Sequence, residues 1–194
     1  MYGRWRTWYC RITAVSFFGI MMIAFGQESK EQRCNRTAMA GFNSTKYLKM
    51  PPAYQTHTEK TSLPPVVCRV TETSEISDGK VNSTTYEYYN SSKVTYYSEE
   101  QCNITMESMK CGQFSAYCRV SIDTYYEDPG NLKDIVFTVY MSVIDTDYKN
   151  YAILYRCMNN GKYGIIDDIW VLKTDRKAKN GLVRKALKKI GKEC

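Results

Sequence analysis

The stretch Thr146-Asp147-Tyr148-Lys149-Asn150-Tyr151-Ala152-Ile153-Leu154-Tyr155-Arg156-Cys157 decides the fold. An apolar and aromatic segment, Val136 to Ile144, precedes it and has the composition that strands prefer. The polar residues from Thr146 onward interrupt this segment as a turn does. A second apolar segment leaves the turn and ends on Cys157. The pattern predicts two antiparallel strands joined by a short turn.

Similar segments, rich in Tyr, Val, Ile and Thr, fill the chain from about residue 50 to residue 173. We expect strands at 52–58, 66–76, 81–89, 93–104, 113–125, 134–145, 149–158 and 164–173. Turn signals separate several of them, namely Asp78-Gly79, Asp128-Pro129-Gly130 and Asn159-Asn160-Gly161. Eight short strands at hairpin spacing favour a closed up-and-down barrel. A sandwich would give a similar pattern, so periodicity alone leaves both open.

The N-terminus is typical of a targeting segment. Three arginines precede an apolar run, residues 12–25, which has signal-peptide length. Ala24 and Gly26 supply the small residues of a cleavage site. We therefore expect residues 1–26 to be removed and residues 27–194 to form a single domain of 194 − 26 = 168 residues. No later segment is long and apolar enough to span a membrane.

The C-terminal segment changes from a strand pattern to a helix pattern. Residues Arg176–Lys192 carry apolar side chains at helical spacing, and these are Leu182, Val183, Ala186, Leu187 and Ile190. Asp175 precedes them as an expected N-cap, and lysines fill the opposite face. We expect an amphipathic helix packed on the outside of the barrel. A second interpretation makes its basic face a polyanion or membrane-surface patch.

Charge and cysteine content limit the class of protein. The formal charge is +7, and without the three arginines of residues 1–26 it becomes +7 − 3 = +4. We expect no nucleic-acid partner, because the chain is exported and the basic run lacks interleaved aromatic residues. Seven cysteines remain after residue 26, without any Cys-x-x-Cys pair and with a single histidine in the chain. They indicate disulfides rather than a zinc site, so no metal is expected, and one thiol is left over.

Five glycosylation sequons agree with export. They begin at Asn35, Asn43, Asn82, Asn90 and Asn103. If these asparagines carry glycans, we expect them in surface loops or at solvent-facing strand positions.

Thr-Asp-Tyr at a hairpin turn is typical of lipocalins, and the chain resembles the salivary lipocalins of blood-feeding triatomine bugs over residues 34–194. The residues that carry the resemblance are Cys34, Gly41-Phe42-Asn43, Lys46-Tyr47, Tyr54, Thr56-His57, Pro65-Val66-Val67-Cys68, Thr146-Asp147-Tyr148, Tyr151-Ala152, Cys157 and Asp167-Asp168. It implies an all-β, eight-stranded antiparallel lipocalin barrel with a C-terminal helix packed outside. The usual lipocalin Gly-x-Trp is absent, and Ala53 stands near the tryptophan position.

The resemblance also implies a disulfide framework. Its pairs are Cys34–Cys157 and Cys68–Cys194, and a third bridge maps best to Cys102–Cys118. Cys111 would then be the odd thiol, although Cys102–Cys111 is an alternative. Haem-binding members of this group use a histidine in the third-to-fourth strand region. The matching stretch here, Tyr86-Glu87-Tyr88-Tyr89, has none, so we expect no haem and no other cofactor.

Strand side chains are the candidate ligand contacts. Inward tyrosines would give an aromatic wall with orienting hydroxyls. Acidic residues could meet an amine, and the candidates are Glu72, Glu87, Asp123, Asp145 and Asp167. Arginines could meet a carboxylate or a phosphate, and the candidates are Arg69, Arg119 and Arg156. The set that we expect in the barrel interior or mouth is Tyr54, Glu72, Tyr88, Tyr117, Arg119, Tyr140 and Tyr155. A register shift of one residue would exchange the two faces.

Catalysis is not expected from these residues. His57 is the only histidine, and no Gly-x-Ser-x-Gly pattern accompanies it. The resemblance implies instead a secreted monomeric scavenger of a small host mediator of platelet activation, vessel tone or inflammation: an eicosanoid, a biogenic amine or an adenine nucleotide. The alternative is an inhibitor that binds a host clotting protease such as thrombin. Bulky side chains that fill the interior would favour the inhibitor, and an open cavity with converging polar groups would favour the scavenger.

Overall fold

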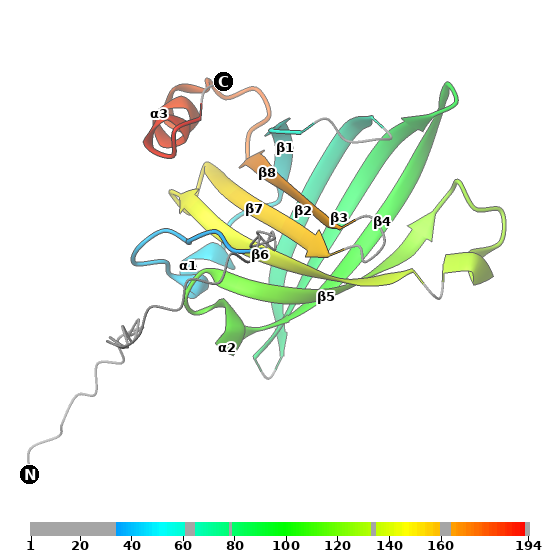
Figure 1. Cartoon of the computed structure of the whole chain (residues 1–194), viewed down its shortest axis with the longest axis horizontal. Coiled ribbons are helices and arrows are strands. Elements are labelled where there is room, and N and C mark those ends of the chain that lie inside the picture. Colours follow the sequence, from blue (N-terminus) through cyan, green and yellow to red (C-terminus); the bar gives the residue numbers. More distant parts are fainter. Residues whose placement is uncertain (1–33, 61–64, 78, 133–134, 160–163, 193–194) are drawn as a thin grey trace, which may run out of the picture. The chain divides into compact units, whose positions relative to one another are not determined.

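The computed structural model describes residues 34–60, 65–77, 79–132, 135–159 and 164–192, all within one compact unit, Arg33–Cys194. Eight antiparallel strands close into a barrel in which each strand pairs with the next and β1 pairs with β8 (Figure 1). They are β1 (Ala53–Thr58), β2 (Val66–Ser77), β3 (Lys80–Ser91), β4 (Val94–Thr105), β5 (Gln113–Asp123), β6 (Val136–Thr146), β7 (Tyr151–Asn159) and β8 (Ile165–Lys173). The expected barrel is confirmed, and the sandwich is excluded.

Helical segments are short, and most lie between strands. They are α1 (Ser44–Tyr47), α2 (Met106–Met109), a 3₁₀ turn η1 (Pro129–Leu132) and α3 (Gly181–Lys189). Among the described residues, no helix is long and apolar enough to cross a bilayer. The expected signal peptide lies outside the described residues and stays a prediction.

The turn between β6 and β7 explains why Thr-Asp-Tyr stands there. Thr146 Oγ1 donates to the Tyr151 carbonyl at 2.6 Å and accepts from the Tyr148 N–H at 2.9 Å. Asp147 Oδ1 accepts three backbone N–H groups, from Lys149, Asn150 and Tyr151, at 2.7–3.1 Å. Burial alone would raise the pKa of Asp147, but these hydrogen bonds lower it. The backbone of Tyr148 adopts the left-handed conformation, with φ of 62°.

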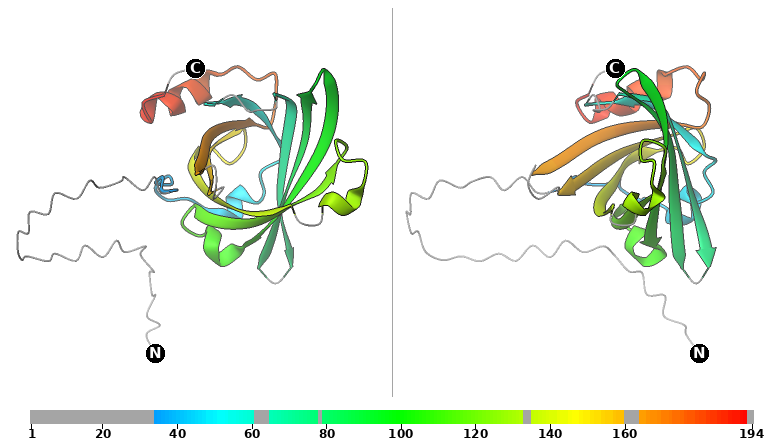
Figure 2. Two further views of the ribbon diagram at one scale, coloured as in Figure 1. Left: turned by 45° about the vertical axis from the view of Figure 1, so that its right-hand side comes forward. Right: turned by 90° about the vertical axis from the view of Figure 1, so that its right-hand side faces the viewer.

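Apolar side chains form two clusters, one on each side of the barrel wall. The inner cluster contains Phe114, Val139 and Leu172, and Tyr47 of α1 joins it at one end of the barrel. The outer cluster lies between β7, β8 and α3, where Val183 and Leu187 pack. Figure 2 shows the strands encircling the interior, with α3 outside the ring. β7 is therefore buried on both faces from Tyr151 to Tyr155.

The C-terminal helix is present but begins later than expected. Asp175 does not cap it, because Asp175 Oδ1 accepts from the Lys177 N–H at 2.8 Å and so caps a separate turn. Asn180 is the N-cap residue, without a side-chain capping bond. Asp175 is thus a turn residue, and the expected N-cap was wrong. The reason is that aspartate stabilises turns and helix starts by the same local hydrogen bond.

Two disulfide bonds cross-link the barrel. Cys34 pairs with Cys157 and ties the N-terminal arm to β7, and Cys102 pairs with Cys118 across β4 and β5. Both are pairs that the resemblance implies. Cys111 is also disulfide-bonded, so the expectation that it is the odd thiol is wrong, as is the alternative Cys102–Cys111 pair.

The remaining expected bridge, Cys68–Cys194, is contradicted by the structure. Cys68 is described, and it carries a free thiol.

Candidate functional site: a basic cleft at the barrel mouth

The barrel wall opens where β1 and β2 diverge. These strands pair at only two positions, Ala53 with Thr71 and Tyr54 with Val70. Beyond Tyr54, β1 instead follows β8. The gap forms a hollow of about 630 Å³, which we call the mouth cleft. Its described lining residues are Gln55–Thr58, Pro65–Arg69, Lys173, Arg176–Ala178 and Asn180.

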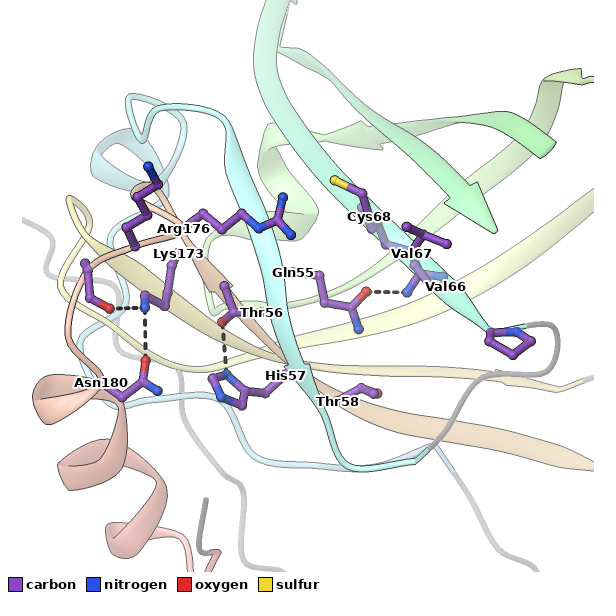
Figure 3. Close-up of a pocket in the computed structure, with 14 residues that line it drawn as sticks. Gln55, Thr56, His57, Thr58, Val66, Val67, Cys68, Lys173, Arg176 and Asn180 are labelled. Atoms are coloured by element: carbon purple, nitrogen blue, oxygen red, sulfur yellow. Dashed lines mark hydrogen bonds between the residues drawn. The ribbon is translucent and has the colours of Figure 1, made fainter. Parts of the chain in front are cut away.

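Basic groups dominate this lining. Figure 3 shows β1 crossing the cleft, with Lys173 and Arg176 on one side and Cys68 on the other. Lys177 and Arg69 add two more cations, and the described lining contains no carboxylate. Lys173 is only 4% exposed, and its Nζ donates to the Ala178 carbonyl and to Asn180 Oδ1. Both acceptors are neutral, so the positive charge of Lys173 is not cancelled within its hydrogen bonds.

Arg69 lines the mouth cleft and also belongs to a charged layer inside the barrel. This layer consists of Arg69, Glu87, Arg156 and Glu100 around Trp170. Arg69 Nε donates to Glu87 Oε2 at 2.5 Å, and its Nη1 donates to Gln55 Oε1. The guanidinium lies over the Trp170 ring, 4.3 Å from its centroid. Burial lowers the pKa of Arg69, and the Glu87 carboxylate opposes this.

A second ion pair uses the same indole. Arg156 Nη2 donates to both carboxylate oxygens of Glu100, at 2.9 and 2.8 Å. Its guanidinium lies 4.9 Å from the centroid of Trp170 and 5.8 Å from that of Phe137. Trp170 therefore contacts two arginines by cation–π interaction. Each arginine carries its own carboxylate partner.

Below this layer the interior is filled. The space between Tyr47, Thr73, Ser83 and Phe114 measures about 20 Å³, which is room for about one water molecule. A drug-sized ligand needs a pocket of roughly 300–1,000 Å³. Among these two spaces, only the mouth cleft has that volume.

His57 faces α3 rather than the interior. The pairing of β1 with β8 shifts between Gln55 and His57, and this bulge puts the two side chains on opposite faces of the wall. His57 Nδ1 lies 3.0 Å from Thr56 Oγ1. Burial lowers its pKa, and the charges of Lys173 and Arg184 lower it further. A second hollow of about 330 Å³ lies between His57, Val171 and Leu187.

The seven residues expected as ligand contacts all lie on the outer face. None of them lines the mouth cleft or the interior space, and their role as ligand contacts stays a prediction. Tyr88 and Tyr117 are 49% and 55% exposed. The rings of Tyr140 and Tyr155 meet edge to face in the outer cluster, with their centroids 6.3 Å apart. The other three members of the set are Tyr54, Glu72 and Arg119.

The alternation of side chains along each strand explains this placement. Arg69, Thr71 and Thr73 of β2 point inward, so Glu72 between them points out. The same parity excludes Tyr88, because its neighbour Glu87 points inward. The inner face of β2 is itself polar, so hydrophobicity does not identify it.

Arg69, Glu87 and Arg156 were among the charged candidates, but Trp170, Glu100 and Gln55 were missed. The sequence held one signal for Trp170, because it is the only tryptophan after residue 26. One cluster of metal-ligand type appears in the described residues, Glu100 with Cys102 and Cys118. Its two sulfurs are joined in a disulfide, so they are not thiolate ligands.

Comparison with known proteins places the chain in a family. The model of the Triabin family matches residues 26–184. The chain belongs to the Triabin family. It is 34% identical to pallidipin of Meccus pallidipennis over 92% of this chain and 88% of that protein. It is 35% identical to dipetalodipin of Dipetalogaster maximus, over 93% and 90% of the two chains. The platelet inhibitor triplatin-2 of Triatoma infestans is 33% identical over 88% and 84%.

Solved structures show the same fold at lower identity. The amine-binding protein of Rhodnius prolixus, in complex with tryptamine, aligns with a TM-score of 0.64, 20% identity and 82% coverage of each chain. LTBP1 in complex with leukotriene C4 aligns with a TM-score of 0.54, 23% identity, and 80% and 84% coverage. This Triabin-family chain thus shares its barrel fold with both of these proteins.

Proposed function

We propose that this Triabin-family protein is a secreted salivary scavenger of a small anionic mediator, first of all an eicosanoid acid, which it holds in the mouth cleft. The main support for this proposal is the mouth cleft, a hollow of about 630 Å³ with four cations and no carboxylate among its described lining residues. A relative named as a platelet inhibitor, triplatin-2, supports an anti-haemostatic role.

The charge of the cleft separates the ligand classes. A biogenic amine needs a carboxylate or an aromatic cage, whereas the cleft presents Lys173, Arg176 and Lys177. An anion gains from these charges. Pro65 and Val67 add apolar surface to the lining, and this surface suits a hydrocarbon chain better than a ribose. Among the expected classes, the lining therefore favours an eicosanoid over an adenine nucleotide and disfavours an amine.

Sequestration in such a site requires no chemical step. The ligand is removed stoichiometrically, and no activity as an enzyme is proposed. Secretion follows from the expected signal peptide, residues 1–26, and the family match begins at residue 26, the last residue of that expected peptide.

The alternative, an inhibitor of a host clotting protease such as thrombin, has one observation in its favour. The interior beneath the charged layer holds a space of only about 20 Å³, so this part of the barrel is packed rather than open. An inhibitor would act through its outer surface and would need no cavity. Inhibition of purified thrombin at a one-to-one ratio, without binding of any small mediator, would replace the scavenger proposal by this one.

Trp170 provides the first test. The oxidised chain 27–194 contains no other tryptophan, so its fluorescence reports from the charged layer beside the cleft. It is titrated with an eicosanoid acid, the methyl ester of the same eicosanoid, tryptamine and ADP, with calorimetry in parallel. We expect one-to-one binding of the acid and weaker binding of the ester, because the ester lacks the negative charge that the cations of the cleft attract.

A matched pair of variants assigns the site. R176Q/K177Q removes two exposed cations from the cleft, and K49Q/K93Q removes two exposed cations elsewhere. We expect the first to weaken binding of the acid by about tenfold or more, and the second by less than about twofold. Tight binding of tryptamine instead of the acid would refute the proposed ligand class.

A further inference from the structure

The C-terminal segment concentrates the positive charge of the chain, and only part of that charge, on Lys173, Arg176 and Lys177, lines the mouth cleft. Residues 173–192 contain nine basic residues and one acid, a net charge of 9 − 1 = +8, whereas the whole chain carries +7. The basic residues are Lys173, Arg176, Lys177, Lys179, Arg184, Lys185, Lys188, Lys189 and Lys192. The remainder of the chain therefore has a net charge of 7 − 8 = −1.

Helix α3 holds four of the seven exposed cations of this segment in a fixed orientation. Val183, Ala186 and Leu187 are at most 5% exposed and anchor the helix on the outer cluster. The opposite face consequently presents Arg184, Lys185, Lys188 and Lys189, all exposed. At about 5.4 Å per helical turn, these four side chains form two adjacent rows along one face.

Few acidic groups balance these cations. Lys189 reaches Asp145 at 3.8 Å, and no ion pair involves the side chains of Arg184, Lys185 or Lys188 within the described part of the chain. The first turn of α3 contains no acidic residue. Pairs of like charge four residues apart, 184 with 188 and 185 with 189, destabilise a helix. An external anion would relieve this repulsion.

We propose that the exposed face of α3 is a docking surface for a linear sulfated polysaccharide of the heparan sulfate type. Such a chain carries closely spaced negative charges that match two rows of cations. None of the five sequons falls within residues 173–192, so the protein's own glycans are attached elsewhere. Docking would retain the scavenger on the vessel and cell surfaces near which host mediators are released.

Other polyanionic surfaces fit this face less well. A helix that lies in a membrane buries its apolar face in lipid, but the apolar face of α3 packs on the barrel. Leu182 is its one large exposed hydrophobic residue, at 56%. Single-stranded nucleic acids are bound with stacking aromatic residues, and residues 173–192 contain none.

The test uses immobilised heparin and the oxidised, glycosylated chain 27–194. Binding is measured at about 0.15 M salt and at rising salt, with fully desulfated heparin as the second probe. Vesicles of phosphatidylcholine with phosphatidylserine are the third probe. We expect binding to heparin that weakens steeply with salt, little binding to the desulfated chain, and higher thermal stability with heparin bound.

Two triple variants of equal charge assign the surface. R184Q/K185Q/K188Q neutralises exposed cations of α3 that do not line the mouth cleft. We expect it to lose affinity for heparin by about tenfold or more and to show a smaller salt dependence. The control is K49Q/K80Q/K93Q, three exposed lysines away from α3, for which we expect a loss below about twofold.

Three outcomes would overturn the proposal. They are no binding to heparin at about 0.15 M salt, equal losses in the two triple variants, and a preference for the phosphatidylserine vesicles over heparin. Circular dichroism of each variant establishes that it folds. Because the α3 variant leaves the cleft lining intact, titration of Trp170 with the eicosanoid acid reports on the scavenging function independently.

Discussion

Removing the charge of Glu100 is expected to destabilise the barrel, because Arg156 would be left charged inside it. The side chains of Arg156 and Glu100 are only 15% and 22% exposed, and both oxygens of Glu100 contact the guanidinium. Breaking a fully buried ion pair costs roughly 3–5 kcal/mol. In Glu100→Gln the amide oxygen still accepts a hydrogen bond, and about a fifth of the carboxylate side chain is already in water. We therefore expect a loss of about 2–3 kcal/mol in the free energy of unfolding.

The adjacent residue provides the matched control. Glu99 lies on the outer face, where its Oε1 accepts from Gln101 Nε2 at 2.8 Å and from Ser121 Oγ at 3.0 Å. No arginine or lysine pairs with it among the described residues. Glu99→Gln makes the same chemical change without leaving a buried cation, and we expect it to cost less than about 0.5 kcal/mol.

Urea unfolding of the chain 27–194, followed by Trp170 fluorescence, measures both variants directly. For a domain of this size, a loss of 2–3 kcal/mol corresponds to a melting temperature lower by about 4–12 °C. The double variant E100L/R156M removes both charges and should recover much of the lost stability. Equal stability of Glu100→Gln and Glu99→Gln would refute the reasoning. A double variant less stable than Glu100→Gln would refute it as well.

Three further predictions follow from single contacts. The pKa of His57 lies below its ordinary 6.5, so folding favours its neutral form. Its contribution to stability is therefore present above pH 6.5 and is lost as the pH falls through its folded pKa. An NMR titration of this single histidine should show the lowered pKa, and Arg184→Gln should raise it; an unchanged value would contradict the coupling. Replacing Cys34 and Cys157 by serine removes the link between two residues 123 positions apart and should lower the free energy of unfolding in urea by about 5 kcal/mol. Asp147→Ala removes an acceptor of three N–H groups and should cost about 1–3 kcal/mol, whereas Asp147→Asn, which keeps an acceptor, should cost less in the same assay.

The sequence by itself determined the eight strands, their antiparallel order and the family. Strand-forming residues and turns are local properties, so Val136–Thr146, the Thr146-Asp147-Tyr148 turn and the strand up to Cys157 could be found without a structure. The helix Gly181–Lys189 was equally visible from its spacing of apolar residues.

Only the tertiary structure decided which face of each strand points inward. Alternation fixes that neighbours such as Glu99 and Glu100 point apart, but it does not say which is inside. Here the outer wall of β7 and β8 is also buried, and the interior contains ion pairs, so hydrophobicity could not choose. The bulge between Gln55 and His57 then breaks the alternation at the cleft itself. The site depends on these long-range contacts, because its cations come from segments more than 100 residues apart.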